Sequence, residues 1–252
     1  LADLERLKKV PALRFETKGN SYSSNVTRLE FNLDNEYFRN EKVRQAVARA
    51  VDRSVIVKVV NYGYGQVSYS PIAPGLKAFH DPAPSPYAFD LKKANALLDE
   101  AGFPKKAGGV RFSVPLDFNP IGSDGPRLAD YLRSALARIG IAATVRAQDP
   151  SAFIKRIYTD RDFALTTNGA SNLFDPTVGV QRLYWSKNFI KGVPFSNGTH
   201  YQSPAVDKLL EDAAIENDPS RRLKLFKDFQ DTVARDVPDL NLYQPVFITI
   251  AN

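Results

Sequence analysis

The sequence has no cysteine, no methionine and only two histidines in 252 residues. Without cysteine there can be no disulfide, no thiolate metal ligand and no cysteine nucleophile. Two histidines cannot form a three-histidine zinc site, and neither His80 nor His200 has a second histidine or a carboxylate at helical ligand spacing. Both are predicted to be surface or loop-packing residues. Neither a metal nor another cofactor is expected.

Long apolar runs and a strong charge of one sign are also missing. No stretch approaches the ~18 consecutive apolar residues of a transmembrane helix. Lysine and arginine (34) exceed aspartate and glutamate (28), so the net charge is 34 − 28 = +6. The two signs interleave, however, and the densest basic runs are pairs such as Lys105 and Lys106. Because nucleic-acid binding needs basic residues gathered on one face, nucleic acid is not an expected partner.

The signatures of common enzymes are absent as well. The sequence contains no GxSxG elbow, no GxxxxGK[ST] loop and no GxGxxG fingerprint. Carboxylate pairs such as Asp160 and Asp162 are present, but their proximity in sequence does not set the separation that glycoside hydrolysis needs. We therefore expect no enzyme. A hydrolase that uses surface carboxylates stays open as an alternative, as does a basic nucleic-acid module.

Hydrophobic periodicity predicts an α/β layer fold without a convincing inter-domain linker. Strands are predicted over residues 26–33, 112–118, 141–145, 163–166 and 240–250. Helices are predicted to begin after the capping residues Asn40, Asp90, Asp149, Ser203 and Asp218, and at Pro126. The alternation over residues 112–166 is typical of a βαβαβ unit with parallel strands. The expected sheet is mixed and largely parallel, with helices on its faces.

Two loops of this unit are the candidates for ligand binding. In open α/β sheets ligands bind outside the carboxyl ends of the strands, which is where residues 119–125 and 167–176 are predicted to lie. The first loop contains Asn119, and the second contains the amides Asn168 and Asn172 and the aromatic residue Phe174. The candidate ligand-binding residues are Asn119, Asn168, Gly169, Asn172, Phe174 and, shortly beyond, Trp185. For Trp185 the alternative is that it anchors the hydrophobic core.

Several segments, in the right order, resemble one protein family. They cover residues 31–33, 43–53, 90–104, 136–141, 201–210 and 222–238, and include Val43-Arg44-Gln45-Ala46-Val47 and Ala50-Val51-Asp52-Arg53. The chain is thereby similar to the family 5 extracellular solute-binding proteins, the peptide, nickel and oligopeptide group that supplies ABC importers. The resemblance covers nearly the whole chain.

This resemblance implies a fold, a function and a set of partners. The chain would be a periplasmic-binding-protein-like lobe (type II, cluster C-like), spanning residues 1–252 with crossover segments at 1–33 and 239–252. Members are about twice as long, so the chain would be the C-terminal lobe of a two-lobed protein. The lobes would close on a small solute by a hinge motion and deliver it to a membrane permease. The location would be periplasmic or extracellular, with or without a lipid anchor, and a signalling receptor would share these features.

Two positions depart from the family pattern. In peptide-binding members a W-x-x-D word supplies an aspartate for the ligand's amino group, and here this word falls on residues 169–172 and ends in Asn172. An arginine that grips the ligand carboxylate in the dipeptide type would fall near Asn119. An amide cannot offset a buried charge, whose burial costs several kcal/mol. A zwitterionic dipeptide is therefore predicted to be a poor ligand. The solute is expected either to be neutral at these two ends or to have its charged ends paired by residues of the other lobe.

Overall fold

The computed structural model describes residues 3–17, 24–83, 85–122 and 124–252. Parts of the predicted crossover segment (1–2 and 18–23) and single residues of two predicted loops (84 and 123) lie outside this range. The core is a six-stranded sheet in the order β3-β7-β2-β6-β4-β5. Its strands are β2 (Asn25–Phe31), β3 (Gly65–Val67), β4 (Phe112–Phe118), β5 (Ile141–Arg146), β6 (Leu165–Ser171) and β7 (Asp239–Pro245).

The directions of the strands correct one expectation. Strands β5, β4 and β6 are mutually parallel, which confirms the βαβαβ unit. The pairs β2–β6, β2–β7 and β3–β7 are antiparallel. The sheet is thus mixed as predicted, but the prediction that it is largely parallel is wrong. Strands β2 and β7 come from opposite ends of the described chain and join the sheet without a helical crossover, so no local pattern fixes their direction.

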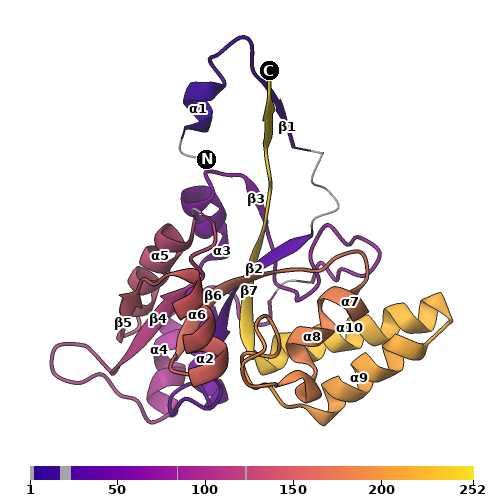
Figure 1. The fold of residues 1–252 in the computed structure, drawn as a ribbon. Coiled ribbons are helices and arrows are strands. Elements are labelled where there is room, and N and C mark those ends of the chain that lie inside the picture. The colour runs from indigo at the N-terminus through magenta and orange to yellow at the C-terminus, as the bar shows by residue number, and fades with distance from the viewer. Residues whose placement is uncertain (1–2, 18–23, 84, 123) are drawn as a thin grey trace.

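The predicted last strand is in fact two strands. Strand β7 ends at Pro245, and β8 (Thr249–Ala251) pairs instead with β1 (Arg14–Glu16). Figure 1 shows this two-stranded ribbon, together with the short helix α1 (Leu4–Leu7), projecting from the body of the molecule. The projecting segments form part of the cavity described below.

The helices begin where the capping residues predicted. They are α2 (Glu41–Ala50), α3 (Arg53–Val55), α4 (Leu91–Glu100), α5 (Gly125–Ala137), α6 (Pro150–Ile154), α7 (Pro176–Gly179), α8 (Gln181–Tyr184), α9 (Pro204–Ile215) and α10 (Pro219–Asp236). The side chains of Asn40, Asp90, Asp149, Ser203 and Asp218 each accept a hydrogen bond from a backbone N–H of the following turn. Two π-helical turns, Ile56–Val60 and Lys155–Asp160, continue α3 and α6.

Two hydrophobic clusters hold these layers together. The larger one packs the sheet, including Leu29 and Phe31, against α2, α4 and α5. The second joins α8, α9 and α10 around Tyr184, Phe226 and Phe229. Figure 1 shows the two groups of helices on opposite sides of the central strands. Among the helices that the structure describes, none combines the length and the apolar character needed to cross a bilayer.

Candidate functional site

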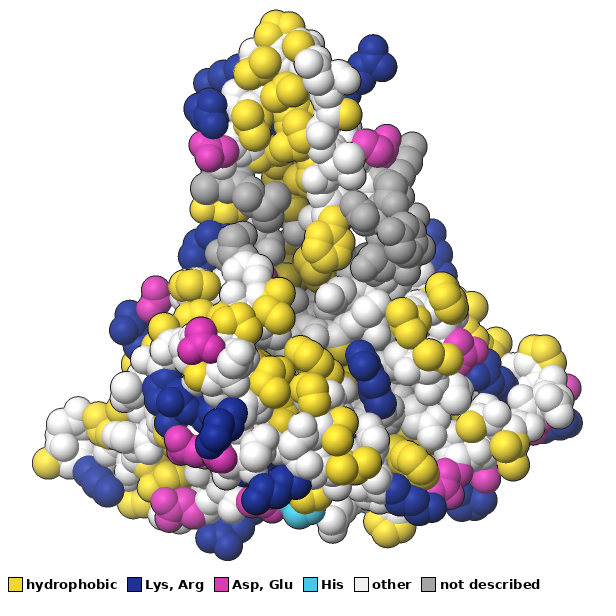
Figure 2. Space-filling view, in the orientation of Figure 1, with side chains coloured by type: hydrophobic (Ala, Val, Ile, Leu, Met, Phe, Trp, Pro, Cys, Tyr) yellow, Lys and Arg dark blue, Asp and Glu magenta, His cyan; other side chains and the backbone are white. Residues whose placement is uncertain are grey.

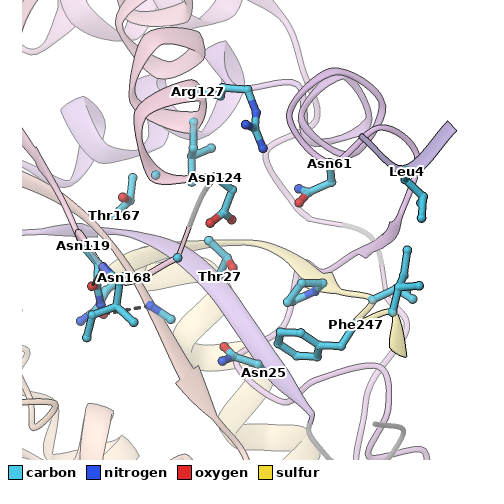
Figure 3. A pocket seen from close by; sticks show the side chains of 18 of the residues that line it. Leu4, Asn25, Thr27, Asn61, Asn119, Asp124, Arg127, Thr167, Asn168 and Phe247 are labelled. Atoms are coloured by element: carbon cyan, nitrogen blue, oxygen red, sulfur yellow. Dashed lines mark hydrogen bonds between the residues drawn. The ribbon is translucent and has the colours of Figure 1, made fainter. Parts of the chain in front are cut away.

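A cavity of about 650 Å³ lies where the projecting ribbon meets the end of the sheet. Its lining comes from segments far apart in sequence: residues 3–7, 25–27, 61, 119–128, 167–169, 195 and 245–250. Figure 3 shows these side chains converging from the strands, from the start of α5 and from the C-terminal strand. Figure 2 shows hydrophobic side chains gathered on the projecting segments above the body. The volume falls in the range of small-molecule sites.

Strand β2 connects the cavity with the core. Alternate residues of a strand share a face, so Asn25 and Thr27 lie on the same face as Leu29 and Phe31. The first two line the cavity and the last two are buried in the larger cluster. Across from Thr27 on β6 is Gly169, where an added Cβ would lie 3.1 Å from the Asn25 side-chain oxygen. The glycine thus leaves room for the Asn25 side chain.

The amides of Asn119 and Asn168 are held in fixed orientations. Asn119 Nδ2 donates to Asn168 Oδ1 (3.0 Å), and Asn119 Oδ1 accepts from the backbone N–H of Ile121 (2.9 Å). Asn168 Nδ2 donates to the Tyr158 hydroxyl (2.8 Å), whose pKa is raised by burial. Both polar atoms of the Asn168 side chain therefore have protein partners, whereas one N–H of Asn119 has no partner in the described part of the chain.

The opposite end of this cavity carries charges. Asp124 precedes the first turn of α5, and its carboxylate accepts a hydrogen bond from the Tyr243 hydroxyl (2.6 Å). Arg127 Nε donates to the backbone oxygen of Val60 (3.3 Å). Among the described residues, Asp124 and Arg127 form no ion pair. Figure 3 shows both side chains together with Asn61 around one end of the cavity.

Three predicted site residues do not line the cavity. Asn172 is 1% exposed, and its side-chain oxygen accepts from the backbone N–H of Ala73. Phe174 is 76% exposed on the loop beyond β6. Trp185 is half-buried against the second cluster, and its indole N–H donates to Glu211 (2.9 Å). A ligand role for these three stays a prediction, as it does for Asn119, Asn168 and Gly169, which do line the cavity.

The reason for the separation is the path of the chain after β6. The predicted strand 163–166 is longer, so Asn168 and Gly169 belong to β6 rather than to a loop. The chain then turns at Leu173, whose φ is +52°. The Arg222 guanidinium donates two hydrogen bonds of 2.8 Å to the Asp175 carboxylate, and these bonds hold the loop against α10. The six candidates are therefore divided: Asn119, Asn168 and Gly169 line the cavity, whereas Asn172, Phe174 and Trp185 lie away from it.

Sequence reasoning missed most of the cavity lining. Asn25 and Thr27 on β2, together with Asn61, Arg127 and Phe195, line the cavity from four separate places in the chain. One signal was available: residues 124–126 place a helix start directly after a predicted strand, where ligands bind in α/β folds. For the others no local signal exists, because only the tertiary fold brings them together. Within the described ranges, no group of three or more histidine and carboxylate side chains is placed to hold a metal ion.

The chain was compared with known protein families. The model of the bacterial extracellular solute-binding proteins, family 5 Middle, matches residues 1–192. The chain belongs to this family. The resemblance inferred from the sequence motifs is thereby confirmed.

Individual relatives agree with this assignment. Di/tripeptide-binding protein 1 of Pseudomonas aeruginosa is 26% identical over 99% of this chain and 46% of its own length. Heme-binding protein A of Haemophilus influenzae is 28% identical over 94% of this chain and 42% of its own length. The solved structure of the periplasmic binding protein DppA from Helicobacter pylori, in complex with the peptide STSA, superposes with a TM-score of 0.87 at 26% identity, covering 99% of this chain and 46% of DppA. The predicted periplasmic-binding-protein architecture is confirmed, and the chain spans about half the length of these relatives.

Proposed function

We propose that this chain is one lobe of a solute-binding receptor that captures a small solute between two lobes and delivers it to the permease of an ABC importer. The observation that carries the proposal is the cavity of about 650 Å³ at the end of the sheet, in a chain of the family 5 solute-binding proteins. Relatives are named for binding di- and tripeptides or heme, which supports a receptor for a small solute. The proposed location is periplasmic or extracellular.

The chemistry of the lining supports binding rather than catalysis. Amides and hydroxyls dominate the polar part, and Asn119 and Asn168 are fixed by hydrogen bonds to each other and to their neighbours. Phe195 and Phe247 contribute apolar surface. Fixed polar groups with apolar surroundings orient a ligand at low entropic cost. Hinge closure against a second lobe would complete the site.

The test is native mass spectrometry of the full-length protein, since a two-lobed receptor can retain its solute through purification. We expect one solute per protein, and a smaller radius of gyration by X-ray scattering when that solute is returned to the stripped protein. A protein that carries no solute, keeps its radius of gyration and hydrolyses peptides or glycosides would instead support the hydrolase alternative. Tight binding of DNA or RNA that weakens steeply with salt would support the nucleic-acid module.

We also propose that a zwitterionic dipeptide is a poor ligand. Neither of the two family anchor positions carries a charge, and the Asn172 side-chain oxygen is already engaged by Ala73. Calorimetry of the full-length protein with dialanine should give no saturable heat at micromolar concentrations. Tight, stoichiometric dialanine binding would contradict this proposal and leave the receptor function intact.

A further inference from the structure

The cavity lining contains polar atoms that the protein leaves without partners. Six buried side-chain nitrogen or oxygen atoms of the described residues have no hydrogen bond. Three of them belong to residues that line this one cavity: Asn25 Oδ1, Asn61 Nδ2 and Arg127 Nη2. Asn61 is only 2% exposed. Since a buried unpaired group costs about 1–3 kcal/mol, three of them around one cavity indicate partners that enter through it.

The unpaired atoms need both kinds of hydrogen-bonding partner. Asn25 Oδ1 is an acceptor, whereas Asn61 Nδ2 and Arg127 Nη2 are donors, and Asn119 adds a further N–H. A carboxylate only accepts hydrogen bonds and an ammonium group only donates them. A hydroxyl group does both, so a solute with several hydroxyls can serve every one of these atoms.

The charges around the cavity favour a neutral solute. Asp124 and Arg127, three residues apart at the start of α5, carry opposite charges, and the third charged residue of the lining, Asp3, is paired with Arg6 (3.2 Å). At the other end Asn119 and Asn168 are uncharged. A charged solute group beside these two amides would therefore be buried without a counter-charge, which costs several kcal/mol.

Two phenylalanines add aromatic surface to a lining whose other apolar side chains include Leu4, Leu128 and Ile250. Phe195 has a φ of +55°, which is unusual for a bulky residue, and its ring packs against Tyr158 with the centroids 5.9 Å apart. Such a conformation costs about 1–3 kcal/mol and persists only where the surroundings enforce it. Phe247 lines the cavity from the C-terminal segment and is 42% exposed. Flat apolar rings beside amides are suited to the C–H faces and the hydroxyls of a sugar.

On these grounds, and resting on the proposed receptor function, we infer that the solute is a neutral, hydroxyl-rich molecule of the short-oligosaccharide class. Asn25, Asn61, Arg127 and Asn119 would bind its hydroxyls, while Phe195 and Phe247 would cover its ring faces. Blocked peptides are also neutral and hydrogen-bond in both directions, so they are the competitor that the experiment must separate.

The experiment measures thermal shift and calorimetric binding of the full-length protein with six compounds. Cellobiose, maltotriose, xylotriose and raffinose represent the inferred class; trialanine and N-acetyl-trialanine amide represent charged and blocked peptides. We expect saturable binding of at least one saccharide, with one molecule per protein, and none of either peptide. In parallel, accurate mass of any solute released in native mass spectrometry should give an oxygen-rich, nitrogen-poor composition.

A variant pair locates the site. Arg127→Met keeps an apolar stem in place of the arginine side chain but removes the guanidinium with its N–H groups, and should weaken saccharide binding at least tenfold. Arg133→Met is the control, because Arg133 lies on the same helix, does not line the cavity, and has a largely exposed side chain that pairs with Asp130 (3.0 Å). Arg127→Lys, which keeps the charge, shows by its melting temperature and residual binding whether a loss reflects unfolding.

Each remaining outcome decides against part of the inference. Binding of a peptide without any saccharide, or a retained solute that is nitrogen-rich, overturns the hydroxyl-rich class and leaves the receptor function standing. If Arg127→Met leaves saccharide binding unchanged, the saccharide does not bind at the Arg127 end of the cavity, and this part of the inference is overturned. If no solute is retained and no compound binds, the inference and the proposed function fail together.

Discussion

The cavity wall at the ends of β4 and β6 and the loop that follows β6 contain similar residues, but their side chains make different hydrogen bonds. The wall holds Asn119, Asn168 and Gly169, and the loop over residues 172–175 holds Asn172 and leads into α7, which ends at Gly179. In the wall, Asn119 keeps an N–H that faces no protein partner in the described chain. In the loop, the Asn172 side chain and backbone tie β6 to Ala73 and Ser24. An amide can serve a ligand only where the fold leaves part of its hydrogen-bonding capacity unused.

The largest difference in stability is expected when glycine is replaced by alanine at Gly179 in one variant and at Gly169 in another. An added Cβ at Gly179 would lie 2.3–2.6 Å from backbone atoms of Asn172, which must then move. Gly179→Ala should lower the free energy of unfolding by about 3 kcal/mol or more, measured by urea denaturation. At Gly169 the nearest atom is the Asn25 side-chain oxygen, at 3.1 Å. Gly169→Ala should cost under about 1 kcal/mol, and equal losses would contradict the comparison.

A second test changes a buried polar group outside both regions. Asp239, the first residue of β7, accepts a hydrogen bond from the Tyr184 hydroxyl (2.7 Å), and burial raises its pKa to about 6 despite the nearby Arg28. The unfolded carboxyl titrates near 3.9. Between these values the folded state holds a proton that the unfolded state has lost, so stability is greatest below pH 4 and falls as pH rises through 6.

The expected loss from this group is about 3 kcal/mol, measured by urea denaturation at several pH values from 4 to 7. Asp239→Asn should remove this slope and leave solute binding unchanged, because Asp239 does not line the cavity. An identical slope in the variant would show that other groups produce it.

A third test compares amides directly. Asn172→Ala leaves the Ala73 N–H without its acceptor and should lower the free energy of unfolding by about 1–3 kcal/mol. Asn119→Ala should destabilise less, since Asn119 is partly accessible, and should weaken binding of the solute retained by the full-length protein. Urea denaturation and calorimetry separate the two effects. A variant of Asn172 that folds normally but loses the solute would place the loop in the binding site after all.

The smallest effect is expected at Leu173. Its φ of +52° is a conformation that glycine adopts readily. Leu173→Gly should therefore raise the free energy of unfolding by about 0.5 kcal/mol, after the entropy cost of glycine is subtracted from the strain that is relieved. Phe195→Gly relieves similar strain but removes a ring from the cavity, and should weaken solute binding. Melting temperatures check the first effect and calorimetry the second; an effect of Leu173→Gly on binding would contradict the division.

Local sequence signals account for the helices and for the parallel unit. The caps at Asn40 and Asp90 and the stop at Gly102 depend on interactions within a few residues, so they can be identified without a structure. The antiparallel strands β2 and β7 could not be oriented, because their pairing joins residues about 200 positions apart. The burial of Arg28 and Glu30 could not be predicted either, because each charge is buried together with its partner in an ion pair whose nitrogen–oxygen distance is 2.7 Å.

The candidate site was predicted in part for the same reason. The rule that ligands bind at the carboxyl ends of parallel strands led to Asn119 and to the end of β6, both of which line the cavity. It could not show that the Asn172 side-chain oxygen accepts a hydrogen bond from the Ala73 N–H, or that the Trp185 indole donates to Glu211 on α9. Both contacts join segments that are distant in sequence. Asn25, Asn61 and Phe195 carry no local mark of a cavity.

The close packing of Gly125 has a consequence for selectivity. An added Cβ there would lie 2.9 Å from both the Asn119 backbone oxygen and the Phe118 ring, so the start of α5 packs directly on the end of β4 and the residue after it. These two parts of the lining must then shift together or not at all. A solute that differs from the natural one by a single methyl group near Asn119 cannot be accommodated by local yielding, and we expect discrimination there to be sharp.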